Sequence, residues 1–394
     1  MSVLLAGGTL WGADGPTDLL IEDGVIAALG ASTTPPAPTY DVSGMLVLPG
    51  LVEAHCHLDK TLYGGPWVPH TAGDALADRI AHDLDRRAGL GVPDVDRITA
   101  LLTTMSGFGT TTVRSHTDVD PIVGLRGVEA VAEAATRLAD RVDVQQVAFP
   151  QHGILTNPGT EQLLDQALSR GVEVIGGIDP AGMDRDPVRH LDVVFGLAER
   201  HGAGIDIHLH DGGSLGAWEL GLIAERTRIL GLGGRVAVSH AYAFGGLSER
   251  EQAALVETLA AAGVAIVTGA VYDFPVPPVK ALRAAGVTVA CGHDGIRDLW
   301  GPYGSGDMLE RARQVAYRST FRRDDDIELA LHAATYGGRR LLGLPAEPLG
   351  VGSVADLVVV DVPSASEAVV TVPARHLVMK AGKAVGGAAA LQAD

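Results

Sequence analysis

The middle of the chain alternates short apolar runs with longer segments rich in Ala, Leu, Arg and Glu. The short runs have the length of strands and the longer ones suit helices, an alternation typical of parallel βα units. Eight such units match a closed (β/α)8 barrel, which takes about 250 residues. The expected strands are 46–55, 111–116, 144–149, 172–178, 205–208, 235–240, 264–267 and 287–293, and the expected helices between them include 128–139, 162–169, 191–200, 220–230, 249–261 and 279–285.

The two ends of the chain have a different pattern. Short strand-like runs at 3–6, 19–21 and 25–29 are separated by glycine-containing turns, and similar runs return at 355–361, 369–372 and 376–380. Such runs are typical of hairpins. We therefore expect an α/β protein with a (β/α)8 TIM-like barrel over residues 46–349 and a small β-sandwich domain formed from residues 1–45 and 350–394. An open doubly wound sheet is the alternative, but no strand is followed by a phosphate-binding glycine motif.

Composition and net charge indicate which kinds of molecule the protein can bind. The 394 residues are 46% hydrophobic, enough for a large core, and 48 acidic against 30 basic residues give a net charge of −18. This charge repels phosphate backbones and anionic membranes, so we expect a small-molecule substrate, no nucleic acid and no membrane partner. No secretion signal and no long apolar run is evident, and the two cysteines, Cys56 and Cys291, do not form a disulfide framework. We expect a cytoplasmic protein, either monomeric or a homo-oligomer.

Side chains that bind metals recur where the expected strands end. His55 and His57 are two residues apart, so their side chains face the same side of a strand. Such a pair alone is often structural or incidental, but a barrel brings the C-terminal ends of its strands together. Three imidazoles and a carboxylate suit Zn²⁺ or Fe²⁺ with a position left for water. The candidates at strand ends are His55, His57, His208, His210, Asp211, His240, His293 and Asp294.

These residues suggest hydrolysis. A metal of this kind lowers the pKa of its bound water from about 15.7 toward about 7, which generates hydroxide near neutral pH. Asp294 and His240 are candidates to accept the water proton, and either His210 or Asp211 to pass it to a leaving nitrogen. Lys60 is a further candidate, although it and Asp59 also fit a solvated loop pair.

Residues 49–60 read Pro-Gly-Leu-Val-Glu-Ala-His-Cys-His-Leu-Asp-Lys, which resembles the strand-one signature of the amidohydrolase superfamily, specifically its cytosine deaminase branch. Ser239-His240 and Gly292-His293-Asp294 resemble its signatures on strands six and eight, and His208 resembles that on strand five. The resemblance covers nearly the whole chain. It implies that His240 contacts water and that the metal ligands are His55, His57, His208 and Asp294.

The same resemblance informs the number of metals and the substrate. Residues 174–178 lack the strand-four Lys or Glu with which binuclear members bridge two metals, so we expect one divalent metal, Zn²⁺ or Fe²⁺. Residues 148–154 are similar to cytosine deaminase, which implies that Gln151 binds the amide edge of the ring. We expect Lys60 and Trp300 to bind substrate beside it.

Two departures argue against simple cytosine deamination. Strand five carries His208-Leu209-His210-Asp211 where the cytosine deaminases have His-x-Asp-Glu, and Asp294 is followed by Gly295 rather than a second Asp. The strand-five motif, together with residues 57–61, 117–120, 177–180 and 296–298, resembles instead the N-isopropylammelide aminohydrolases. The resemblance implies a metal-dependent hydrolytic deaminase, an amino- or alkylamino-hydrolase, in which metal-bound hydroxide attacks the amine-bearing carbon of a cytosine-like pyrimidine or a hydroxylated s-triazine.

Two alternatives remain. The first is a hydrolase of cyclic amides, hydantoin-like or lactam-like, on the same scaffold; such enzymes commonly use two metals. The second is a non-catalytic scaffold, which usually loses metal ligands, whereas all four are present here.

Overall fold

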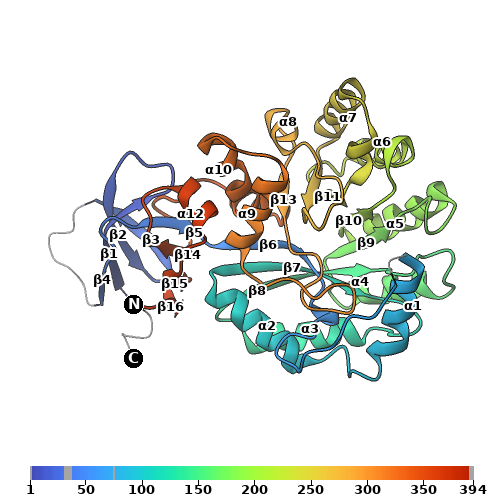
Figure 1. The fold of residues 1–394 in the computed structure, drawn as a ribbon, viewed down its shortest axis with the longest axis horizontal. Helices are drawn as coiled ribbons and strands as arrows, with labels where there is room; N and C mark the ends of the chain where they lie inside the picture. Colours follow the sequence, from blue (N-terminus) through green and yellow to red (C-terminus); the bar gives the residue numbers. More distant parts are fainter. Residues whose placement is uncertain (1, 31–37, 74–75, 390–394) are drawn as a thin grey trace.

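The computed structural model describes residues 2–30, 38–73 and 76–389. Figure 1 shows two parts, a sheet built at the ends of the chain and a larger unit in which helices surround a central sheet. Within the described ranges, no helix has both the length and the apolar character needed to cross a membrane.

The larger unit is an eight-stranded parallel sheet whose strands follow one another in sequence order. A bridge between Cys56 and Asp294 brings the last strand beside the first, so the sheet is nearly closed. This arrangement fits the (β/α)8 barrel expected from the sequence. The strands are β6 (Leu51–Cys56), β7 (Thr110–Asp118), β8 (Asp143–Phe149), β9 (Val174–Ile178), β10 (Gly204–Leu209), β11 (Val236–His240), β12 (Val264–Thr268) and β13 (Val289–Cys291).

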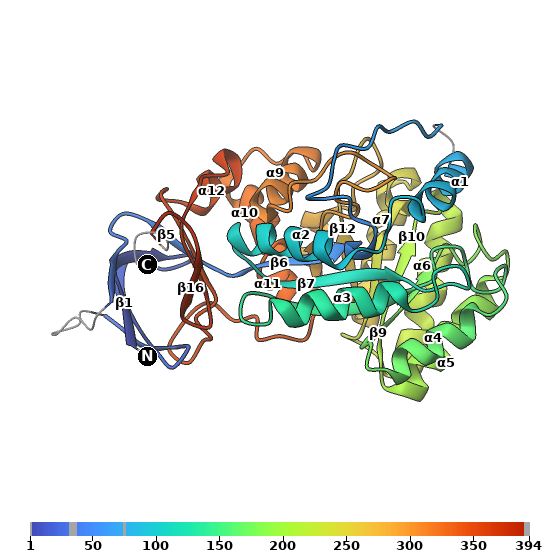
Figure 2. The same cartoon turned by 90° about the horizontal axis from the view of Figure 1, so that it is seen from below.

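Helices cover the outside of the barrel (Figure 2). Their ends follow local capping rules: Ser248 and Glu251 form a capping box at the start of α7, and α5 begins with Pro187 after the capping residue Asp186. The helices and short 3-10 turns are η1 (Leu58–Lys60), α1 (Leu76–Arg87), α2 (Val95–Gly107), α3 (Arg126–Arg137), α4 (Thr160–Ser169), α5 (Pro187–His201), α6 (Gly213–Ile229), η2 (Tyr242–Gly246), α7 (Glu249–Ala262), α8 (Val279–Ala284), α9 (Met308–Arg318), α10 (Asp324–Ala333), α11 (Tyr336–Leu341) and α12 (Ala365–Thr371).

Strands from both chain ends form the second sheet. Its central strand β5 pairs in parallel with β1 and antiparallel with β14, so the N- and C-terminal segments are joined by backbone hydrogen bonds. The sheet buries its own apolar cluster, which includes Leu5, Leu19 and Leu357. Its two-layered sandwich form stays a prediction. The strands are β1 (Ser2–Leu10), β2 (Pro16–Glu22), β3 (Val25–Leu29), β4 (Thr39–Asp41), β5 (Leu46–Pro49), β14 (Leu357–Val360), β15 (Arg375–Lys380) and β16 (Lys383–Gly386).

The expectation of one continuous strand over 46–55 is wrong. The segment divides at Gly50 into β5, which belongs to the terminal sheet, and β6, which begins the barrel. The Gly50 amide donates to Asp356 O at 2.8 Å and the Leu51 amide to Gly109 O at 2.9 Å, so hydrogen bonding changes sheet between adjacent residues. An uninterrupted apolar run does not reveal such a change. We therefore place the passage from the terminal sheet to the barrel at Gly50 rather than after residue 45.

The strand expected at 369–372 is also wrong, because residues 365–371 form helix α12. Ser364 caps this helix by accepting from the Glu367 amide at 3.3 Å. Ala368 and Val369 are buried in the main apolar cluster of the barrel. Burial of one helical face therefore outweighs the preference of Val for strands.

The junction predicts a specific sensitivity to side-chain volume. A Cβ atom at Gly50 would lie 2.3 Å from Thr111 Oγ1 and 2.6 Å from Thr111 Cγ2. We expect Gly50→Ala to lower the free energy of unfolding by about 1–3 kcal/mol through overpacking, measured by denaturant titration. Thr111→Ala in the same chain should restore part of the loss. Gly15→Ala is the control, because its Cβ would meet nothing within 4 Å; equal effects at the two glycines would contradict this interpretation.

Candidate active site

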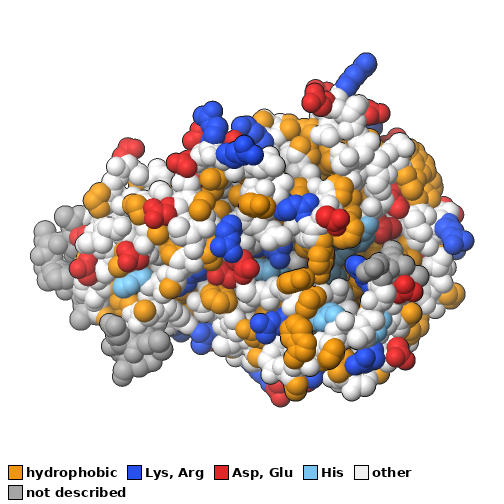
Figure 3. All heavy atoms as spheres, in the orientation of Figure 1, with side chains coloured by type: hydrophobic (Ala, Val, Ile, Leu, Met, Phe, Trp, Pro, Cys, Tyr) orange, Lys and Arg blue, Asp and Glu red, His pale blue; other side chains and the backbone are white. Residues whose placement is uncertain are grey.

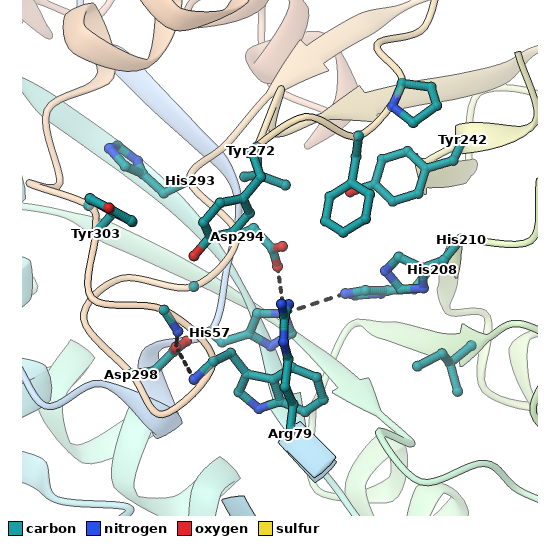
Figure 4. Close-up of a pocket in the computed structure, with 18 of the residues that line it drawn as sticks. His57, Arg79, His208, His210, Tyr242, Tyr272, His293, Asp294, Asp298 and Tyr303 are labelled. Atoms are coloured by element: carbon teal, nitrogen blue, oxygen red, sulfur yellow. Dashed lines mark hydrogen bonds and ion pairs between the residues drawn. The ribbon is translucent and has the colours of Figure 1, made fainter. Parts of the chain in front are cut away.

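The structure brings the four expected metal ligands together at the C-terminal ends of the strands. His55 is the penultimate residue of β6 and His57 follows the strand, His208 lies on β10, and Asp294 lies beyond the end of β13. One potential ligand atom from each lies within 4.8 Å of all the others. His57 Nε2 is 3.2 Å from Asp294 Oδ1 and 3.4 Å from His208 Nε2. Figure 4 shows these three side chains pointing toward one another.

Neighbouring groups orient the two imidazoles of the first strand. His55 Nδ1 lies 2.8 Å from Ser239 Oγ, which in turn donates to Asp206 at 2.8 Å. His57 Nδ1 lies 2.9 Å from the carbonyl oxygen of His116. When His57 is protonated at Nδ1, that nitrogen donates to this carbonyl oxygen. In both rings Nε2 faces the centre of the cluster. Hydrogen bonds of this kind fix the tautomer and orientation of metal-binding histidines.

The donor set fits a divalent cation. In the described part of the chain His55 Nε2 is buried without a hydrogen-bond partner. Burial, with the nearby Lys60 charge, lowers the pKa of His57 to about 4, and burial lowers that of His208 well below its usual value. Burial alone would raise the pKa of Asp294, but the surrounding histidines hold it well below its usual range. Neutral imidazoles and an ionised carboxylate are the forms that bind metal.

Two other groups of metal-capable side chains are less suited. They are His55 with His116 and Asp206, and His57 with Asp59 and Asp118. Arg114 pairs with Asp206 at 2.9 Å, and Lys60 and Arg87 pair with Asp118 at 2.9 and 2.8 Å. Because these fixed cations already neutralise the carboxylates, they disfavour a metal ion there.

His240 and His210 stand next to the ligand cluster. Their rings stack with centroids 4.5 Å apart, and His240 Nε2 is buried without a hydrogen-bond partner among the described residues. His210 Nδ1 is 2.8 Å from Asp179 Oδ2. Burial by itself would lower the pKa of His210, but the Asp179 carboxylate more than offsets it and the pKa is raised. His210 also lines the main cavity, so it is placed to hold a proton there.

Asp211 faces a different way from His210. Its carboxylate accepts from the Gly182 amide at 2.8 Å, and it is not among the described residues that line the cavity. It lies beside Glu219, whose pKa is raised to about 8 by burial and by the Asp211 charge. Of the two alternatives for proton relay, the geometry favours His210 and gives Asp211 a place in supporting the loop after β9.

The three expected substrate-binding residues form one wall of the cavity. Lys60 Nζ donates to Gln151 Oε1 at 2.5 Å and lies 5.9 Å from the ring centroid of Trp300. All three side chains line the cavity. Lys60 is 3% exposed and Asp59 5%, so a solvated loop pair is excluded.

A chain of buried charges holds Lys60 in place. Asp118 Oδ1 pairs with Lys60, while Asp118 Oδ2 pairs with Arg87. Arg87 closes helix α1 and pairs with Asp83 one turn earlier at 3.0 Å. The Asp118 amide donates to Asp59 at 3.0 Å. Of these five charged side chains, Lys60 is the one that lines the cavity.

Several site residues were not identified from the sequence. The cavity, of about 1040 Å³, is also lined by the carboxylate residue Asp298, whose pKa burial raises to about 6. Asp179 lines it as well and lies where a strand ends, which was the available signal; His293, already a strand-end candidate from the sequence, also lines it. No sequence motif marked the remaining group, the aromatic residues Tyr242, Tyr272, Phe274 and Tyr303.

Comparisons with known proteins identify the family of this chain. The model of an amidohydrolase family matches residues 92–385. The chain is 32% identical over 359 residues to N-isopropylammelide isopropyl amidohydrolase from Pseudomonas sp. (strain ADP), covering 88% of this chain and 87% of that protein.

Two solved structures extend the similarity to the fold. N-isopropylammelide isopropylaminohydrolase from Burkholderia multivorans ATCC 17616 superposes with a TM-score of 0.93 and 46% identity over 98% of both chains. The 5-methylcytosine deaminase from Klebsiella pneumoniae, liganded with 5-fluorocytosine, gives a TM-score of 0.85 and 27% identity over 98% of this chain and 97% of that one. The chain therefore belongs to the amidohydrolase family.

Proposed function

We propose that this protein is a metal-dependent hydrolase that removes an amine from a small nitrogen heterocycle, either a cytosine-like pyrimidine or a hydroxylated s-triazine. The observation that carries the proposal is that one cavity is lined by three of the four clustered ligands, by the His210–Asp179 pair and by the Lys60–Gln151 pair; the three ligands are His57, His208 and Asp294. Relatives named as isopropylammelide and methylcytosine enzymes support the substrate class.

The proposed reaction replaces a ring carbon–nitrogen bond with a carbon–oxygen bond. Water supplies the oxygen to the ring and its protons to the nitrogen, so the products are a hydroxylated or oxo ring and a free amine. A single Zn²⁺ or Fe²⁺ ion held by His55, His57, His208 and Asp294 would supply Lewis acidity that lowers the pKa of water toward about 7.

The protein's own groups move the protons. Asp294, kept ionised, and His240, kept neutral by burial, are the bases nearest the cluster. His210, whose protonated form is favoured by the Asp179 carboxylate, is the acid that delivers a proton to the departing nitrogen. Proton acceptor and donor are thus separate residues whose pKa values are displaced in opposite directions, as acid–base chemistry requires.

Lys60, Gln151 and Trp300 orient the ring. Lys60 presents an ammonium group to the cavity, which suits the oxygen of a hydroxylated or weakly acidic ring. Gln151 offers an amide that matches the alternating donors and acceptors of such rings, and Trp300 offers a face for stacking. Release of an amine distinguishes this activity from ring opening of a cyclic amide, which releases none.

We expect the purified protein to contain about one equivalent of Zn²⁺ or Fe²⁺, measured by elemental analysis. His57→Ala should lose most of it and should no longer show the rise in melting temperature on metal addition, because binding to the folded state stabilises it. His376→Ala, in strand β15 of the terminal sheet, is the matched control. Wild-type metal content in the His57 variant would contradict the ligand assignment.

His210→Asn and Asp211→Asn should separate the two candidate proton donors. We expect the His210 variant to lose about 10²- to 10⁴-fold in kcat with its metal retained, as for removal of a general acid. The Asp211 variant should stay within a few-fold of wild type, since Asn can still accept from the Gly182 amide. Steady-state amine release measures both, and the reverse ranking would overturn the assignment.

Lys60→Met should lower kcat/KM about 10- to 100-fold, the cost of a charge-assisted hydrogen bond of about 1.5–3 kcal/mol. Metal content and melting temperature show whether the variant is folded. Lys280→Met is the control, because that lysine is exposed and pairs with Asp326 outside the cavity. Equal kcat/KM values for the two variants would remove Lys60 from the substrate site.

A further inference from the structure

The cavity is larger than one small ring requires. Its volume of about 1040 Å³ lies at the upper end of sites for drug-sized ligands, which take about 300–1,000 Å³. Its inner end is formed by buried lining residues, among them His57, His208, Lys60 and Gln151. Figure 3 shows hydrophobic side chains gathered around the hollow in which histidine side chains are visible.

Four aromatic rings lead outward from the inner end, and we call them the aromatic path: Tyr242, Phe274, Tyr272 and Tyr303. Tyr242 and Phe274 stack with centroids 5.0 Å apart, Phe274 meets Tyr272 edge-on at 6.4 Å, and Tyr272 meets Tyr303 at 6.1 Å. Exposure rises along it, from 39% for Phe274 to 47% for Tyr272 and 71% for Tyr303. All four rings line the cavity, so their free faces are available to a ligand.

The path begins where the proposed reaction releases the amine. The ring of Tyr242 lies 5.6 Å from that of His210 and 5.4 Å from that of His240. Figure 4 shows Tyr242 beside His210. A heterocycle held by Lys60 and Gln151 with its amine toward His210 would therefore direct any group on that nitrogen along Tyr242 and Phe274.

Helix α9 fixes the loop that carries two of these rings. Arg311 donates to Gly269 O at 2.6 Å, Gln314 to Ala270 O at 3.2 Å and Arg318 to Phe274 O at 2.7 Å. Tyr272 adopts a left-handed backbone with φ of 48°, a conformation that costs energy for a residue other than glycine. Three side chains on one helix thus hold the loop in a conformation that presents Tyr272 and Phe274 to the cavity.

We propose that the aromatic path binds an extended apolar substituent on the departing amine, an aryl or arylalkyl group larger than isopropyl. This inference rests on the proposed function for the identity of the reacting nitrogen. The path binds such a group because aromatic faces gain from both burial and offset or edge-on ring contacts. A polar substituent would gain neither the burial of apolar surface nor the ring contacts.

The test uses ammelides that carry hydrogen, methyl, isopropyl or benzyl on the amine nitrogen, with the metal-loaded full-length protein. We measure kcat/KM for amine release and, by calorimetry, the Kd of each compound. We expect the benzyl compound to exceed the methyl compound about tenfold or more in both affinity and kcat/KM, and to exceed the isopropyl compound as well. Benzyl values equal to or below the isopropyl values would overturn the proposal.

Variants test whether the advantage of the benzyl compound depends on the aromatic path. Phe274→Ala should abolish the benzyl advantage while leaving the values for unsubstituted ammelide within a few-fold of wild type, and Phe274→Leu serves if the alanine variant is unstable. Tyr317→Ala is the control, because Tyr317 is 82% exposed on α9 and does not line the cavity. A loss that is uniform across the series, or equal in the control, would overturn the assignment to Phe274.

The outcomes separate the two proposals. If no compound releases an amine, including unsubstituted ammelide, the proposed function fails. The calorimetric series then decides the aromatic path alone, because a benzyl advantage that depends on Phe274 supports the binding site without turnover.

Discussion

The closure of the barrel between β6 and β13 depends on the buried carboxylate of Glu53. Its Oε1 accepts from the amides of His55 at 3.1 Å and His293 at 2.9 Å, and its Oε2 lies 2.5 Å from His293 Nδ1. Strand β13 has only three residues, so backbone pairing alone holds it weakly in register. Gly292 permits the approach, since a Cβ there would lie 2.3 Å from Glu53 Oε1. The Asp294 amide also donates to His55 O at 2.9 Å, so the Glu53 contact and this hydrogen bond together hold His55 and Asp294 close in the ligand cluster.

Around that closure each of three side chains proposed to take part in the reaction is held by a neighbouring polar group. Ser239 orients His55, Asp179 holds His210, and Asp118 holds Lys60. His240 and Asp294 have φ values of 71° and 66°, which non-glycine residues rarely adopt. The surrounding fold supports this backbone strain at the strand ends, where Asp294 joins the ligand cluster and the His240 ring lies beside it. The site is thus organised before substrate arrives.

The sequence was informative where a regular strand fixes side-chain direction and less so beyond the strand end. The spacing of His55 and His57 predicts a shared face, and the barrel brings His208 and Asp294 to it. His210 and Asp211 are neighbours after β10, and only their partners, Asp179 and Gly182, distinguish them. The aromatic path lacked any periodic signal, because Tyr242 begins the short 3-10 turn η2 and the other three rings lie on irregular segments. The break at Gly50 was hidden inside an apolar run that suits both sheets equally.

The placement of the ligands also bears on how the protein matures. His55 and His57 come from the first strand of the barrel and Asp294 from just beyond the last, so the complete donor set exists only after nearly the whole barrel has been synthesised and closed. During synthesis the chain emerges from its N-terminal end, so His55 and His57 are present before Asp294 has been made. Metal binding by the proposed ligand set therefore follows closure of the barrel.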